Sequence, residues 1–174
     1  MEPTHSALIV AVAEAEAVVG AHRDLLDEAA SWGVPAHITV CFPFLPPAEI
    51  DEHVLAGLRQ AAAGVPAFFC ALTEVRWFDE RVVWLAPDPP GPFQSLTAAV
   101  TARFPAARPY DGLYDEVVPH LTIGHDHPPA ALKGAADAVG EHLPIHARVT
   151  SMRLAVGSPV PGASWLTLEE FALG

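Results

Sequence analysis

Lysine is almost missing from this chain of 174 residues: Lys133 is the only one, and eight arginines supply the remaining positive charge. The 21 acidic residues leave a formal net charge of −12. Proteins that hold a long stretch of nucleic acid depend on many phosphate contacts from lysine and arginine. The composition therefore argues against a long nucleic-acid partner, but it leaves room for a small phosphate substrate held in a pocket.

Cysteine and long hydrophobic runs are also scarce. Cys41 and Cys70 both lie in apolar, strand-like segments, so we expect two buried thiols and no disulfide scaffold. The apolar run over residues 7–13 is far too short to cross a bilayer. No basic residue precedes this run and an acidic residue follows it, which is unlike a signal peptide. We therefore expect no membrane span and a cytoplasmic location.

The apolar pattern predicts a mixed α+β chain. Hydrophobic residues make up 51% of the sequence and charged residues 17%, which is typical of a globular protein and not of a disordered one. We expect strands at residues 6–12, 36–42, 68–78, 82–86, 118–124, 145–156 and 164–171. We expect helices at residues 14–30, from the Pro-Pro pair at 46–47 to about 63, at 92–104 and at 129–142. The inner face of the first helix is predicted to consist of Val18, Leu25, Leu26 and Ala29.

The predicted elements follow the same order twice. Strand, helix, loop and a second strand describe residues 6–42, and the same order describes residues 82–124. The similarity is one of order, since few residues are identical between the two segments. It indicates one domain over residues 1–174, built of two lobes related by an approximate twofold axis.

The second strand of each segment carries the same short motif. Residues 35–44 read PAHITVCFPF, and residues 118–125 read VPHLTIGH. Because side chains alternate between the two faces of a strand, each histidine shares a face with the threonine two residues later. The neighbouring aliphatic residues take the opposite face and anchor the strand in the core. One such motif would most simply be structural, but two in matching places of a repeated order predict a shared functional site: His37, Thr39, His120 and Thr122.

Two imidazoles and two hydroxyls in one cleft are suited to the hydrolysis of a phosphodiester. The ordinary histidine pKa of about 6.5 allows one imidazole to act as a base toward water while the other protonates the leaving oxygen. The threonine hydroxyls can donate hydrogen bonds to the phosphate oxygens. This scheme requires no metal ion, and it predicts a bell-shaped pH dependence with limbs on either side of neutrality. The motifs are too alike to assign the roles firmly; His120 as base and His37 as acid is the working assignment.

The sequences HITV at residues 37–40 and HLTI at residues 120–123 resemble the two His-x-Thr/Ser-x motifs of the 2H phosphoesterase superfamily, also called 2'-5' RNA ligase-like proteins. The resemblance extends over nearly the whole chain. It implies a bilobal α+β fold in which two antiparallel sheets with outer helices enclose a central groove. It also implies metal-independent phosphodiester chemistry, typically the opening of a 2',3'-cyclic nucleotide, without a cofactor.

The acidic composition narrows what the resemblance implies. RNA-processing members of the family usually bring basic residues to hold the chain, and this sequence has few. We therefore expect a small cyclic phosphate or nucleotide-type substrate and a monomeric protein. A non-catalytic phosphate-binding module and an RNA-end-processing or 2'-5' RNA ligase-type activity are the alternatives.

Further candidates lie outside the two motifs. In the loop at residues 105–117, Arg108, Tyr110 and Tyr114 could hold a phosphate or stack on a base, or could simply be solvated. Trp84 could be a base platform or a core residue. A metal hydrolase built on the histidines of the second motif and the loop after it is a third alternative, because nearby imidazoles are common zinc ligands; these are His120, His125 and His127.

Overall fold

Eight strands and five helices make up the computed structural model, which describes residues 1–174, and they intermix without a strict alternation. The strands are β1 His5–Ala11, β2 His37–Cys41, β3 Phe68–Phe78, β4 Val82–Asp88, β5 Leu121–His125, β6 Ile145–Val149, β7 Ser151–Gly157 and β8 Leu166–Ala172. The helices are α1 Glu16–Leu26, α2 Glu28–Ser31, α3 Glu52–Ala63, α4 Gly91–Arg103 and α5 Pro129–Gly140. The predicted α+β class is confirmed.

All eight strands belong to one curled antiparallel sheet with the order β6-β3-β4-β5-β2-β1-β7-β8. The sheet consists of two four-stranded halves that meet where β2 pairs with β5. At this seam a single pair of residues, Ile38 and Leu121, is in register. The two sheets expected from the sequence are therefore the two halves of one continuous sheet.

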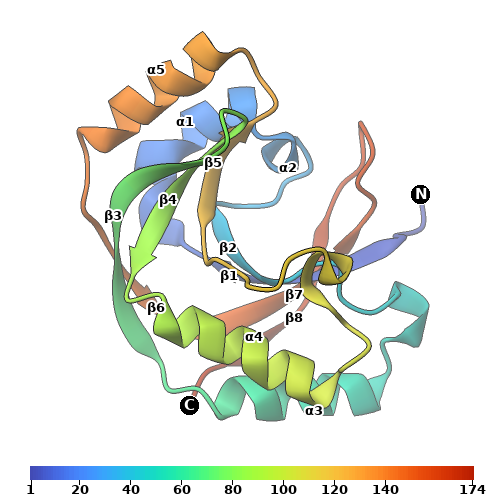
Figure 1. Ribbon diagram of the computed structural model, residues 1–174. Helices are drawn as coiled ribbons and strands as arrows, with labels where there is room; N and C mark the ends of the chain where they lie inside the picture. Colours follow the sequence, from blue (N-terminus) through green and yellow to red (C-terminus); the bar gives the residue numbers. More distant parts are fainter.

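The predicted repeat of order is visible in the two halves. The first half has the order β1, α1, β2, with the short helix α2 between α1 and β2, and the second has the order β4, α4, β5. Each of these helices contacts the strand of the other half: α1 packs against β5, and α4 packs against β2 (Figure 1). Because each helix packs on the half of the sheet to which it does not belong in sequence, both halves are covered by a helix. The seam between β2 and β5 therefore lies at the centre of the molecule.

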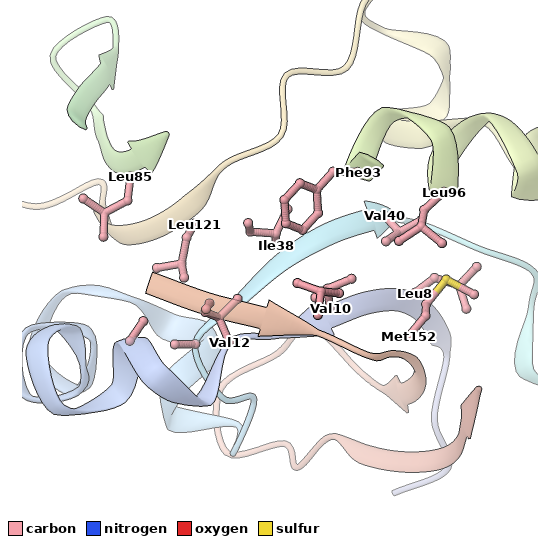
Figure 2. Close-up of a cluster of buried hydrophobic side chains, with 14 of the residues drawn as sticks. Leu8, Val10, Val12, Ile38, Val40, Leu85, Phe93, Leu96, Leu121 and Met152 are labelled. Atoms are coloured by element: carbon pink, nitrogen blue, oxygen red, sulfur yellow. The ribbon is translucent and has the colours of Figure 1, made fainter. Parts of the chain in front are cut away.

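The hydrophobic core extends across the seam. One cluster of buried side chains includes Ile38 from β2, Leu121 from β5 and Leu85 from β4. Figure 2 shows Ile38 and Val40 beside Phe93 and Leu96 of α4. Burying one such side chain contributes about 1.5–3 kcal/mol. This energy fixes which face of β2 and β5 packs inward, and it leaves the opposite face for the polar residues of the motifs.

The first predicted helix is interrupted at Asp27. Its backbone is extended there, and its side chain accepts a hydrogen bond from the Ala29 backbone N–H, so that it caps the short helix α2. The inward face of α1 is also rotated relative to the predicted one, since its buried residues are Val19, Arg23 and Leu26. Leu25 was expected on the inner face, but it is 76% exposed, whereas Val19 is fully buried.

The predicted strand over residues 145–156 is two strands in different halves of the sheet. β6 pairs with β3 at one edge, whereas β7 lies between β1 and β8 in the other half. The buried residues of β6 are Ile145, Ala147 and Val149, whereas those of β7 include Met152, Leu154 and Val156, with Ala155 buried beside them. The apolar alternation therefore slips by one residue at Thr150, where the chain passes from one half to the other.

Three smaller features complete the fold. The helix expected from the Pro-Pro pair begins later, at Glu52, after Asp51 caps it by accepting a hydrogen bond from the Val54 N–H at 2.9 Å. Cys41 and Cys70 are buried and unpaired, as expected. No helix of the chain combines the length and apolar character that crossing a bilayer requires.

Candidate functional site

β2 presents the first motif as the alternation predicts. Ile38 and Val40 are buried in the core, while His37 and Thr39 are partly exposed on the other face. His37 is the first residue of the strand and not a mid-strand residue, because the Ala36 N–H donates to Glu16 and does not extend the ladder with β1. Its Nδ1 lies 2.8 Å from the carbonyl oxygen of Pro35. A carbonyl oxygen can only accept, so Nδ1 carries the proton and Nε2 is left free for chemistry.

The second motif repeats this arrangement. Leu121 and Ile123 of β5 are fully buried, and Thr122 is partly exposed on the other face. His120 directly precedes the strand, and its Nδ1 lies 2.7 Å from the carbonyl oxygen of Val118, again two residues earlier. Both histidines are therefore held in the same tautomer, with Nε2 available.

The seam brings the two motifs together. Ile38 pairs with Leu121 across antiparallel strands. Continuing this register by one residue in each direction sets His37 level with Thr122 and Thr39 level with His120. The four predicted catalytic residues thus form a set with local twofold symmetry on one face of the seam.

Both side chains keep some contact with solvent, but the surrounding protein removes most of the water from the imidazole rings, and this desolvation lowers the pKa of both below the ordinary histidine value. For His37 the hydrogen bond to Pro35 opposes this effect, while the positive charges of Arg23 and of a protonated His120 add to it. The bond to Val118 likewise opposes the lowering at His120. Both histidines are therefore neutral at pH 7 in the absence of an anion.

The segment before His37 is held by hydrogen bonds from α1. The Arg23 guanidinium donates to the Val34 carbonyl oxygen at 3.1 and 3.2 Å. The Ala36 N–H donates to Glu16 Oε1 at 2.5 Å, and the Ala36 carbonyl oxygen accepts from the Val12 N–H at 2.8 Å. Because Pro35 itself bonds to the imidazole, this segment fixes the orientation of His37.

Arg23 is in turn held by a buried ion pair. Its Nη2 lies 3.0 Å from Asp27 Oδ2, and both side chains are almost completely buried. Asp27 also lies 3.7 Å from Nε2 of His125. The sequence reasoning gave neither Arg23 nor Asp27 a role, although their spacing of four residues on a helix is a signal for such a pair.

His120 is surrounded by aromatic rings, whereas the segment before His37 is held by hydrogen bonds. Its ring centroid lies 5.1 Å from that of Phe78 and 5.7 Å from that of Trp84, both in edge-on geometry. Trp84 is only 3% exposed, and the Arg76 guanidinium lies 6.0 Å from its ring. This burial favours the core alternative for Trp84, which forms a wall behind the histidine and offers no open face to a base.

A cavity of about 150 Å³ opens beside the first motif. His37 and Thr39 form one side of it, and the remaining lining is largely apolar. Four aromatic side chains from separate parts of the chain contribute: Trp32, Phe42, Tyr110 and Trp165. Trp32 and Trp165 were not expected to meet here, because they are 133 positions apart in the sequence; Trp32 lies shortly before the first motif, but Trp165 is far from both. We call this cavity the tryptophan pocket.

The three candidates from the loop lie in different places. Tyr110 lines the tryptophan pocket, and burial raises the pKa of its phenol to about 12. Its backbone is left-handed, with φ of 53°, and its N–H donates to the Phe42 carbonyl oxygen at 2.6 Å. Such strained backbone is often found at functional sites. Tyr114 packs its ring against Tyr110 but is 64% exposed, and Arg108 lies outside the pocket lining.

The alternative metal site is not assembled. His125 lies beside Asp27 and Asp126, away from the face that His120 and Thr122 share. No three side chains of His, Cys, Asp or Glu are grouped so that they could hold a metal ion. The structure thus does not bring together the three histidines on which that alternative rests.

The fold and the paired motifs define an α+β protein with two His-x-Thr strands at the centre of one curled sheet. A sequence model of the 2'-5' RNA ligase superfamily matches residues 6–158. The chain belongs to this superfamily, and the resemblance to 2H phosphoesterases is confirmed.

Solved structures show the same fold. E. coli LigT complexed with NADP+ is similar over 99% of both chains, with 22% identity and a TM-score of 0.61. E. coli LigT complexed with 3'-AMP gives 19% identity and a TM-score of 0.60 over 99% of both chains. TT0787 of Thermus thermophilus gives 17% identity and a TM-score of 0.60 over 97% of both chains. The comparison with curated proteins gave no match.

Proposed function

We propose that the protein is a phosphodiesterase that hydrolyses a small cyclic phosphate, such as a nucleoside 2',3'-cyclic phosphate. The observation that carries this proposal is the pair of imidazoles in the same tautomer on one face of the seam. Each Nδ1 donates to the carbonyl oxygen two residues earlier, so each Nε2 is free to accept or deliver a proton. One phosphodiester hydrolysis uses one such base and one such acid.

The proton transfers balance between the two imidazoles. Nε2 of the neutral histidine removes a proton from water, and the water oxygen forms a new bond to phosphorus. The bond from phosphorus to the leaving ribose oxygen breaks with its electron pair. Nε2 of the protonated histidine delivers a proton to that oxygen, and the product is a phosphomonoester. We assign His120 as the base and His37 as the acid; Thr39 and Thr122 donate hydrogen bonds to the phosphate oxygens.

The proposed reaction is acid–base chemistry between two side chains and needs no metal ion. The negative charge of the substrate contributes to it. Because burial has lowered the pKa of both histidines, an anion bound between them raises the pKa again and allows one of them to carry a proton. Binding of the phosphate thus prepares the acid that the reaction needs.

A small substrate is favoured over a long RNA by the charges of the protein. Five of the eight arginines already form ion pairs with acidic side chains: Arg23, Arg59, Arg76, Arg81 and Arg153. The similar LigT structures are complexes with NADP+, 3'-AMP, phosphate and ATP, all far smaller than an RNA chain. RNA-end processing, 2'-5' RNA ligase-type activity and phosphate binding without turnover are the competing assignments.

One experiment separates these assignments. Purified protein is incubated with nucleoside 2',3'-cyclic phosphates, 3',5'-cyclic phosphates and 2'-5'-linked dinucleotides, with and without a chelator. We expect hydrolysis of the 2',3'-cyclic compounds at an unchanged rate in the chelator. Joining or cleavage of 2'-5' linkages in preference to cyclic phosphates would support the ligase-type assignment, and nucleotide binding without any turnover would support the binding module.

A further inference from the structure

The tryptophan pocket contains a wall of aromatic rings beside the proposed phosphate site. The ring centroids of Trp32 and Trp165 are 6.2 Å apart with 24° between the planes. Phe42 lies 6.1 Å from Trp165 at 58°. Together with Tyr110, these rings line a cavity that also includes His37 and Thr39. A ligand that places its phosphate at the motifs thus has an aromatic surface directly next to it.

The rest of the lining excludes a charged group. β1 and β7 contribute Ala7, Ile9 and Ala155, and no acidic side chain, lysine or arginine lines the pocket. A second phosphate in this cavity would lose its hydration without gaining a counter-charge, which is costly. The pocket volume of about 150 Å³ is smaller than the roughly 300–1,000 Å³ of pockets that enclose a whole drug-sized ligand. It therefore suits one uncharged, ring-sized portion of a ligand.

We propose that the tryptophan pocket is a nucleobase subsite that makes the enzyme selective for cyclic phosphates carrying a base over those without one. This inference rests on the proposed function, since the phosphate must lie at His37 and Thr39. The subsite recognises the face of the base by stacking, because few polar atoms line the pocket to read its edge. Stacking on aromatic side chains tolerates all bases. We expect the four common bases to differ by less than about tenfold in kcat/KM, as stacking alone discriminates weakly.

Gly157 keeps Trp165 in place. A Cβ atom at this position of β7 would overlap the indole ring of Trp165, so the ring lies directly against the strand backbone. The backbone N–H of Trp165 donates to the Trp32 carbonyl oxygen at 2.9 Å, which ties the two tryptophan-bearing segments together, and the indole N–H donates to the Ser158 carbonyl oxygen at 3.3 Å. The absence of a side chain at Gly157 is therefore what allows the wall to form. A substitution there displaces the ring without removing it.

The test compares KM for adenosine 2',3'-cyclic phosphate with KM for glycerol 1,2-cyclic phosphate, which has no base. We expect Trp165→Leu and Trp32→Leu each to raise KM for the adenosine compound roughly 5- to 150-fold, the range for loss of one base–aromatic stack. KM for the glycerol compound should change less than about twofold. Gly157→Ala should act like Trp165→Leu, and it keeps the test available if that variant fails to fold. Trp77→Leu is the matched control, since Trp77 is 37% exposed on β3 outside the pocket.

Equal effects on both substrates, or no effect on either, would overturn the subsite. If neither substrate is hydrolysed, the proposed function fails, and the subsite is then tested by calorimetric binding of 3'-AMP and glycerol 3-phosphate to the wild type and Trp165→Leu. A base subsite predicts that only 3'-AMP binding weakens. Equal affinities of the wild type for the two ligands would contradict it, as would tighter binding of octyl phosphate than of 3'-AMP, which would indicate a site for an aliphatic chain.

Discussion

Ile38 on β2 pairs with Leu121 on β5, and this pair is the only one in register between the two halves of the sheet. Both side chains are fully buried. On the opposite face, the residues next to them in sequence are the four polar residues of the motifs. The packing of one apolar pair thus sets the relative position of His37, Thr39, His120 and Thr122.

Truncation of this pair should therefore reduce both stability and activity. Ile38→Ala is expected to lower the free energy of unfolding by about 2–5 kcal/mol, and Ile38→Val by about 0.5–1.5 kcal/mol, because a larger cavity costs more. Urea denaturation measures both values. Leu25→Ala is the matched control: Leu25 is 76% exposed, and its truncation should change stability by no more than about 0.5 kcal/mol. A large loss at Leu25 together with a small loss at Ile38 would contradict the described core.

The buried ion pair between Arg23 and Asp27 should be costly to break from one side. Arg23→Met leaves the Asp27 carboxylate buried without its partner, so we expect a loss of about 3–5 kcal/mol in unfolding free energy. The double variant Arg23→Met/Asp27→Leu should recover a large part of this loss, since no uncompensated charge remains.

The exposed pair of Lys133 and Asp137 is the control for this prediction. It has the same spacing of four residues and the same N–O distance of 3.0 Å. Lys133→Met should cost at most about 0.5 kcal/mol, because water already solvates both charges. Similar losses for Arg23→Met and Lys133→Met would show that the Arg23 pair is not buried.

The pH profile of kcat/KM should lie at lower pH than two unperturbed histidines would give. Burial lowers the pKa of both His37 and His120, so in the free enzyme both titrate below the ordinary value of about 6.5. Activity falls at low pH when the base is protonated, and at higher pH when the acid loses its proton. The bell in kcat/KM should therefore have its maximum below about pH 6.5, and not limbs on either side of neutrality as the sequence alone indicates.

The bell in kcat should lie at higher pH than the bell in kcat/KM. The former reports the enzyme with substrate bound, and the bound phosphate anion stabilises the imidazolium form. Steady-state kinetics from about pH 4 to about pH 9 measures both profiles. A kcat/KM maximum above neutral pH would contradict the burial of the two histidines.

Much of the site could be predicted because it depends on local rules. Strand alternation places His37 with Thr39 and Ile38 with Val40, and the structure shows these faces. The order of strand, helix, loop and strand, which occurs twice in the sequence, predicted that the sheet has two similar halves. The motif pair could be recognised because each copy is contained within four residues.

The remaining features depend on contacts between distant residues. Trp32 and Trp165 meet only because the strands curl and the chain after α2 approaches the loop before β8. The break at Asp27 has a local signal, since aspartate is a favoured N-cap residue, but the burial of its side chain depends on the ion pair with Arg23. The division between β6 and β7 does have a signal in the sequence, because the apolar alternation changes phase at Thr150.

The most direct test of the proposed chemistry is the turnover of a nucleoside 2',3'-cyclic phosphate by the wild type, His37→Ala and His120→Ala. The fold of each variant is checked by its thermal unfolding. Each substitution should reduce kcat by roughly 10²–10⁴-fold or more, because each removes one of the two proton-transfer groups. Full activity in either correctly folded variant would contradict the paired-histidine mechanism.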